Sequence, residues 1–193
     1  YVKDLLGSFT TSFSTSSADR SKNVNSGAKH VNGTVLYPGE TFSMYETVAP
    51  FTAENGYAMA GSYLNGEVVD SMGGGICQVS TTLYNAVLRA ELEVVERSPH
   101  SMTVHYVELS EDAAIAGTYK DFKFKNSTDY PIYIEGYTTS DKKITFNIYG
   151  KETRDSNRSI SFESVLVNEV KPNTILRDDA GQGLGYKNVS AGK

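Results

Sequence analysis

A glycine triplet, Gly73-Gly74-Gly75, leads directly into a segment with a strong helical pattern, residues 76–90. At 100° per residue, the apolar side chains of that segment fall within about 100° of one another, which is the width of a stripe that one helical face buries. The stripe consists of Ile76, Val79, Leu83, Ala86, Val87 and Ala90. The pattern therefore predicts a helix that packs one face into the core of a folded domain.

An earlier segment predicts a second helix, and a turn signal predicts a hairpin. Ser16 or Ser17 can cap the amino end of this helix, and Gly33 is typical of its carboxyl end. Further along, Asn65-Gly66 lies between two short runs of strand-forming residues, which favours a two-residue hairpin turn. We therefore expect a helix followed by a hairpin before the glycine triplet.

The second half of the chain is predicted to be largely β. Apolar and polar residues alternate there, as they do in strands with one buried face, and turn residues separate the runs. The expected strands are residues 102–106, 122–125, 130–134 and 144–148, with a further candidate at 160–170. The sequence therefore predicts an α+β fold, an antiparallel β-meander or sheet packed with a few helices, with the cysteine at the amino end of a central helix.

Length and composition limit the class of protein. The 193 residues suffice for one substantial domain, and we expect a boundary near residue 150, with a C-terminal strand and a Gly-rich linker in residues 151–193. A net charge of −5 argues against nucleic-acid binding, and no apolar run is long enough to span a bilayer. The three histidines and the single cysteine show no metal-ligand spacing, so we expect neither a metal nor another cofactor.

The single cysteine, Cys77, lies on an unusual side of the predicted helix. It is about 130° from the centre of the apolar stripe, on a side shared with Ser80 and Tyr84. It also occupies the first turn, where free amides and the helix dipole stabilise a thiolate. The preceding glycines can offer amides to an oxyanion. This pattern indicates a nucleophile; the alternative is a buried, inert thiol, since free cysteines are among the most buried residues.

A thiolate nucleophile needs a base, and His100 is the best candidate. His30 falls at the exposed end of the early helix, and His105 alternates out of phase with the apolar residues around it. His100 is in phase with those residues and is expected to face the packed side; the alternative is a structural histidine bonded to a nearby carbonyl. Either Asp112 or Asp121 could orient the imidazole, and the sequence does not choose between them.

The segment around the cysteine also resembles a known family. Residues 73–86, Gly-Gly-Gly-Ile-Cys-Gln-Val-Ser-Thr-Thr-Leu-Tyr-Asn-Ala, are similar to the signature of the VanW domain family, which is named after a protein of vancomycin-resistance clusters. Further segments agree with it: residues 6–11, 38–43, 99–101, 121–126 and 129–134. The resemblance identifies residues 1–150 as a VanW-like catalytic domain. Many members carry a second histidine where this chain has Ser98, so the resemblance places the base on His100.

The resemblance implies an activity. Family members are bacterial cell-envelope proteins, and some have been linked to L,D-transpeptidase activity with a cysteine nucleophile. By resemblance, Cys77 attacks a tetrapeptide stem of peptidoglycan, releases D-alanine and forms a thioester, which an acceptor amine converts into a 3–3 crosslink. His100 and Asp112 are the expected catalytic partners. The residues expected around the substrate and the oxyanion are Gly74, Gly75, Ile76, Gln78, Ser80, Tyr84, Ser101 and Tyr106.

The same resemblance implies partners and a location. The partners are donor and acceptor stem peptides, and the location is extracytoplasmic, at the cell wall of a Gram-positive bacterium. A membrane anchor and additional wall-binding modules are expected in the full-length protein. Two alternatives remain open: a cysteine peptidase that hydrolyses stem peptides, and a non-catalytic module that binds peptidoglycan or assists another enzyme.

Overall fold

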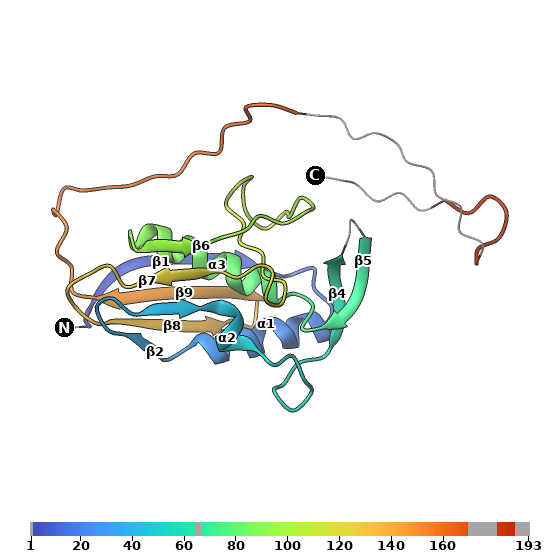
Figure 1. Ribbon diagram of the computed structural model, residues 1–193, viewed down its shortest axis with the longest axis horizontal. Coiled ribbons are helices and arrows are strands. Elements are labelled where there is room, and N and C mark those ends of the chain that lie inside the picture. The colour runs from blue at the N-terminus through green and yellow to red at the C-terminus, as the bar shows by residue number, and fades with distance from the viewer. Residues whose placement is uncertain (1, 65–66, 170–180, 188–193) are drawn as a thin grey trace.

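The hairpin formed by strands β8 (Ile132–Thr138) and β9 (Lys143–Gly150) is the centre of the main sheet. In the computed structural model, which describes residues 2–64, 67–169 and 181–187, two strands from the amino-terminal part flank this hairpin. Strand β1 (Asp4–Ser12) pairs with β9, and the short β2 (Thr34–Leu36) pairs with β8, all antiparallel (Figure 1). The beginning and the end of the domain are therefore joined in one four-stranded sheet.

Two long helices, α1 (Ala18–Val31) and α3 (Ile76–Arg89), pack on this sheet and against each other. The Ser17 side chain caps α1 by accepting a hydrogen bond from the Arg20 amide, as the sequence predicts. Helix α1 covers β8, whereas α3 covers β1 and β9. The opposite face of the sheet carries half-exposed polar and tyrosine side chains, such as Tyr133, so the sheet has one wet face.

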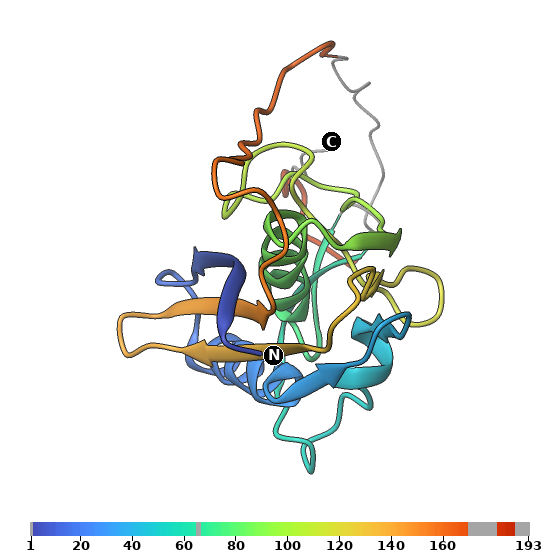
Figure 2. The same cartoon turned by 90° about the vertical axis from the view of Figure 1, so that its left-hand side faces the viewer.

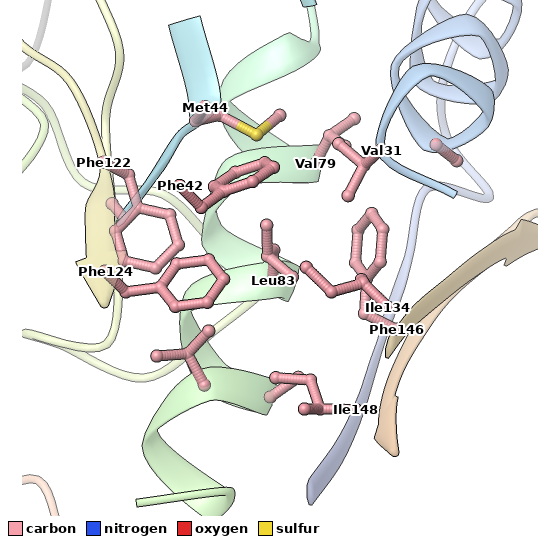
Figure 3. Close-up of a cluster of buried hydrophobic side chains, with 14 of the residues drawn as sticks. Val31, Phe42, Met44, Val79, Leu83, Phe122, Phe124, Ile134, Phe146 and Ile148 are labelled. Carbon is pink, nitrogen blue, oxygen red and sulfur yellow. The ribbon is translucent and has the colours of Figure 1, made fainter. Parts of the chain in front are cut away.

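A second, three-stranded sheet lies on the other side of α3. It is formed by β3 (Thr41–Ser43), β7 (Lys123–Lys125) and β6 (Glu93–Glu96), and the short helix α2 (Met44–Val48) continues directly from β3. Figure 3 shows the resulting core, with Leu83 of α3 between the phenylalanines of this sheet and the apolar side chains of α1, β8 and β9. Because both sides of α3 are covered, most of its side chains are buried.

A separate two-stranded hairpin, β4 (Met59–Leu64) and β5 (Glu67–Met72), immediately precedes the glycine triplet and α3. The strands pair where the sequence predicts a hairpin, although the turn residues Asn65 and Gly66 lie outside the described residues. In Figure 1 this hairpin stands at the end of the molecule away from the amino terminus, next to the start of α3. It therefore forms a wall beside Cys77.

The α+β fold class and the position of the cysteine at the start of α3 are confirmed. The strand predicted at residues 102–106 is wrong, because this segment is irregular and makes no ladder. Val104 and Tyr106 instead line a pocket together with the start of α3, and the chain around them is held by hydrogen bonds such as Ala114 N to Ser98 O at 2.8 Å. Figure 2 shows this yellow-green segment arching over the green helix α3.

The chain beyond β9 differs from the prediction as well. Residues 160–169 contain no strand, which makes the candidate at 160–170 wrong over its described part; residue 170 lies outside it. The chain just before this segment is attached to the domain by ion pairs, because Arg158 and Arg154 both contact Glu91, and Arg154 also contacts Glu152. Strand β9 ends at Gly150, and the proposed division into residues 1–150 and 151–193 stays a prediction.

A candidate cysteine–histidine–aspartate site

Cys77 occupies the first turn of α3 because the glycines before it allow a tight approach. Gly75 precedes the helix with a φ of 105°, a left-handed conformation that side chains disfavour. A Cβ atom on Gly74 would lie 2.2 Å from the carbonyl oxygen of Ala60 in β4. The triplet thus joins the β4–β5 hairpin to α3 at close quarters. The half-buried Cys77 thiol lies 3.4 Å from the carbonyl oxygen of Ile115.

His100 lies next to Cys77, close enough for the two side chains to interact electrostatically, and both line the same groove. The Nδ1 atom of His100 is 2.7 Å from Oδ2 of Asp112, which leaves the other ring nitrogen, Nε2, for the sulfur. His100 is only 8% exposed and Asp112 only 1%. Thiol, imidazole and carboxylate are therefore linked in the order that nucleophile, base and orienting group require.

Asp112, and not Asp121, contacts His100. Its Oδ2 accepts hydrogen bonds from both the backbone amide and the ring of His100, at 2.6 and 2.7 Å. Its Oδ1 accepts from Nη2 of Arg97 at 2.9 Å, and Arg97 Nε also donates to its carbonyl oxygen. Asp121 instead accepts from the Ser43 hydroxyl and from the backbone amide of Tyr45 at the start of α2. Of the two candidates that the sequence leaves open, the structure brings Asp112 to His100, and its catalytic role stays a prediction.

Polar residues of α3 hold the segment that carries Asp112. The Thr81 hydroxyl accepts from the amide of Ala113 at 3.0 Å and donates to its carbonyl at 3.3 Å. One turn further, the Asn85 side chain donates to the carbonyl of Glu111 at 2.8 Å. Both side chains are fully buried. The helix that carries the thiol thus also fixes the aspartate that orients the histidine, an arrangement that sequence analysis missed.

The surroundings of His100 favour its charged form. Burial lowers the pKa of this imidazole, but the hydrogen bond with Asp112 and the electrostatic interactions with Asp112 and Cys77 outweigh that effect and raise the pKa to about 9. Burial also raises the pKa of the nearby Tyr106 hydroxyl, so that residue stays a neutral hydrogen-bonding group. His100 therefore presents a positive charge beside Cys77.

The thiol opens onto a large groove of about 1260 Å³. Its walls come from the β4–β5 hairpin, the amino end of α1, the start of α3 and the irregular segment after β6. Besides Cys77 and His100, the expected residues that line it are Gly75, Ile76, Gln78, Ser101 and Tyr106. The volume exceeds that of a typical small-molecule pocket, so the groove has room for a peptide.

Three residues expected around the substrate are not part of the groove lining: Gly74, Ser80 and Tyr84. Ser80 is fully buried in the domain, and the Tyr84 ring packs edge-on against Phe122. Gln78 touches the groove, but its amide nitrogen donates to Thr11 and to the Ser12 carbonyl. The side chains of Ser80, Tyr84 and Gln78 therefore pack α3 against its neighbours. Because α3 is covered on several sides, most of its polar side chains are buried as well.

The first turn of α3 presents backbone amides next to the thiol. In the parts of the chain that the structure describes, the amides of Gly75 and Cys77 donate to no backbone carbonyl, whereas those of Ile76 and Gln78 donate to Gly73 and Gly75. Amides at a helix start can stabilise a developing negative charge. This turn therefore combines a nucleophile with candidate oxyanion donors.

The other two histidines have different positions relative to the site. His30 sits exposed at the end of α1, where its Nδ1 contacts the Ser26 carbonyl oxygen, and His105 is exposed at the groove. Within residues 2–64, 67–169 and 181–187 no group of three or more His, Cys, Asp or Glu side chains could hold a metal ion. Over the same ranges, each helix is too short or too polar to traverse a bilayer.

The sequence of the chain matches a recognised family. A sequence model of the family described as "VanW like protein" matches residues 19–149, so the chain belongs to the VanW-like family. The match contains Cys77, His100 and Asp112.

Two curated relatives support the family assignment. An uncharacterized protein of Bacillus subtilis (strain 168), YoaR, is 42% identical over 129 residues, which cover 67% of this chain and 43% of that protein. The vancomycin B-type resistance protein VanW of Enterococcus faecalis (strain ATCC 700802 / V583) is 31% identical over 134 residues, which cover 66% of this chain and 48% of VanW. The chain therefore spans less than half the length of either relative. No solved structure matches it.

Proposed function

We propose that the chain is a cysteine-dependent L,D-transpeptidase that acts on the stem peptides of peptidoglycan. The observation that carries this proposal is the linked set of Cys77, His100 and Asp112 at the wall of a peptide-sized groove. Two further findings support a role in cell-wall chemistry. The chain belongs to the VanW-like family, and its relative VanW is named as a vancomycin resistance protein.

In the first half-reaction, the Cys77 thiolate attacks the carbonyl carbon that precedes the terminal D-alanine of a tetrapeptide stem. The carbonyl oxygen becomes an oxyanion, which the amides of Gly75 and Cys77 stabilise. The C–N bond then breaks, His100 gives its proton to the leaving amine, and D-alanine departs. A thioester between Cys77 and the shortened stem remains.

In the second half-reaction, the side-chain amine of a second stem attacks the thioester carbonyl. Neutral His100 accepts the proton of this amine, the C–S bond breaks, and the Cys77 thiolate is restored beside an imidazolium. Asp112 keeps the imidazole in one orientation through both proton transfers. The size of the groove supports binding of donor and acceptor together, which favours transfer over hydrolysis.

The proposed substrate also implies where the protein acts. Stem peptides are found outside the cytoplasm, so the protein would act at the cell wall of a Gram-positive bacterium. The chain spans less than half of its relatives, and a membrane anchor or wall-binding modules would belong to the remaining length.

The test is a reaction of the purified chain with tetrapeptide muropeptides, analysed by chromatography and mass spectrometry. We expect 3–3 crosslinked dimers and free D-alanine from the unmodified chain, and neither from Cys77→Ser. Tripeptide products without dimers would assign the chain as a peptidase instead. Unchanged muropeptides would leave a binding module and overturn the enzymatic proposal.

A further inference from the structure

Arg20 of α1 holds its guanidinium group against the first turn of α3, beside Cys77. Its Nη1 atom donates to the Ser16 hydroxyl at 2.5 Å and to Oε1 of Gln78 at 3.0 Å. Its aliphatic stem lies over Gly75, where an added Cβ would come within 2.8 Å of Cγ. Arg20 therefore contacts residues on both sides of Cys77, and it lines the groove.

The guanidinium group exposes the edge that arginines use to bind carboxylates. Within the residues that the structure describes, Nε and Nη2 of Arg20 have no hydrogen-bond acceptor, and Arg20 forms no ion pair. These two atoms form one side of the planar fork that can grip both oxygens of a carboxylate.

Other arginines of this chain already use that edge in this way. Arg158 contacts both carboxylate oxygens of Glu91 through Nε and Nη2, and Arg154 holds Glu152 with the same two atoms. Arg97 places Nη2 on the Asp112 carboxylate and Nε on the backbone carbonyl of the same residue. Arg20 lines a groove whose described lining residues include no carboxylate, and the same two atoms of Arg20 have no acceptor there. The half-buried guanidinium group of Arg20 would be stabilised by an anionic group of a bound ligand.

We propose that Arg20 binds the terminal carboxylate of the donor stem peptide, that is, the carboxylate of the residue that leaves. This inference rests on the proposed function, because it needs a peptide whose scissile carbonyl lies at Cys77. The attacked carbon must come within about 3–3.5 Å of the sulfur. The carboxylate lies one residue further, and consecutive Cα atoms are about 3.8 Å apart. A group that flanks the cysteine in the first turn of α3 is placed to reach it.

Such a contact would make the site prefer a peptide with a free terminal carboxylate. A carboxylate in the fork makes paired, charge-assisted hydrogen bonds, whereas a neutral amide or a continuing peptide leaves Arg20 without a countercharge in the groove. The enzyme would thus act on the last peptide bond of a stem and disregard internal bonds. Arg20 is then the residue that determines where along the stem the thiol attacks.

The experiment measures binding, so that it does not depend on turnover. The chain with Cys77→Ala is titrated calorimetrically with a synthetic stem tetrapeptide that ends in a free carboxylate, and with the same peptide ending in a carboxamide. With Arg20 present, we expect the acid to bind about 10- to 100-fold more tightly than the amide. In Arg20→Gln the two affinities should become equal, and Arg20→Lys should keep a reduced preference.

The ratio of the two affinities separates recognition from structural damage. If Arg20 only ties α1 to α3, its replacement weakens both peptides equally and leaves the ratio unchanged, which would overturn the proposal. Equal affinities in the Arg20 parent, or no binding of either peptide, would overturn it too. Arg158→Gln is the matched control and should keep the acid preference, because Arg158 pairs with Glu91 away from the groove.

The two proposals can fail separately. Acid-selective binding by a chain that forms no crosslinked dimers would keep the carboxylate site and remove the transpeptidase. Dimers from a chain that binds acid and amide equally would do the reverse.

Discussion

Replacing Asp112 with asparagine tests the electrostatic link between the carboxylate and His100. Asparagine has nearly the same shape and keeps an oxygen that can accept the hydrogen bond from Nδ1, but it carries no charge. In the native site, the carboxylate accepts two hydrogen bonds from His100 and one from Arg97. The substitution therefore removes the charge that compensates for burial of the imidazolium.

The size of the effect follows from the pKa of His100. Its value of about 9, against an ordinary value of 6.5, corresponds to about 3 kcal/mol in favour of the imidazolium. Because the pKa is raised in the folded state, this stabilisation is fully present below about pH 6.5 and is lost as the pH rises through about 9. In Asp112→Asn, burial is opposed less strongly, so the pKa should fall well below 9 and this pH dependence should shrink.

Two measurements check this prediction. The imidazole resonances of His100 are followed by NMR between about pH 5 and 10, and the free energy of unfolding in urea is measured at both ends of the range. Acylation by a stem peptide should slow by about 10²- to 10⁴-fold in Asp112→Asn. The control Asp141→Asn, at the exposed β8–β9 turn, should leave the His100 titration unchanged. A His100 pKa that stays near 9 in Asp112→Asn would refute the reasoning.

Two further substitutions test how the site is held. Arg97→Met should lower the free energy of unfolding by about 1–3 kcal/mol and slow acylation at least about 10-fold, because the buried Asp112 carboxylate then has one charged donor fewer. Urea unfolding and acylation rates measure the two effects, and native values in both would contradict the role of Arg97. Gly74→Ala should destabilise the domain by about 1–3 kcal/mol, since the added Cβ would lie 2.2 Å from the Ala60 carbonyl oxygen. A melting temperature equal to that of the native chain would show that the β4–α3 junction is looser than described.

The helix α3 and the direction of Cys77 could be predicted because both depend on local periodicity. A stripe with a fixed angular width leaves little choice about which side chains enter the core, and Leu83 and Val79 are fully buried as expected. The same rule places Cys77 off that stripe, at the groove. What periodicity did not reveal is that the other side of α3 is covered too, so Ser80 is buried instead of facing a substrate.

The partner of His100 could not be chosen from the sequence, because the decisive contacts connect distant residues. Asp112 and Asp121 both follow short polar stretches, and both accept backbone hydrogen bonds in the structure. Their difference arises from Thr81, which is 32 residues from Ala113 and fixes the segment beside His100. No local pattern encodes a pairing of a helix with an irregular loop.

The wrong strand at residues 102–106 has a related cause. Alternating apolar and polar residues show that one side of a segment is buried, but they do not say what buries it. Here Val104 is buried and both Val104 and Tyr106 line the groove beside the start of α3, so the alternation arises without a neighbouring strand. A period of two is necessary for a half-buried strand and is not sufficient.

The most direct test of the central claim is the intact mass of the chain after brief exposure to a tetrapeptide stem and an acid quench. A reactive Cys77 beside His100 predicts a mass increase equal to the stem without its terminal D-alanine, carried on Cys77 and lost on treatment with hydroxylamine. The Cys77→Ala chain should gain nothing. An adduct that survives in Cys77→Ala, or an unmodified native chain that also releases no D-alanine, would contradict the account.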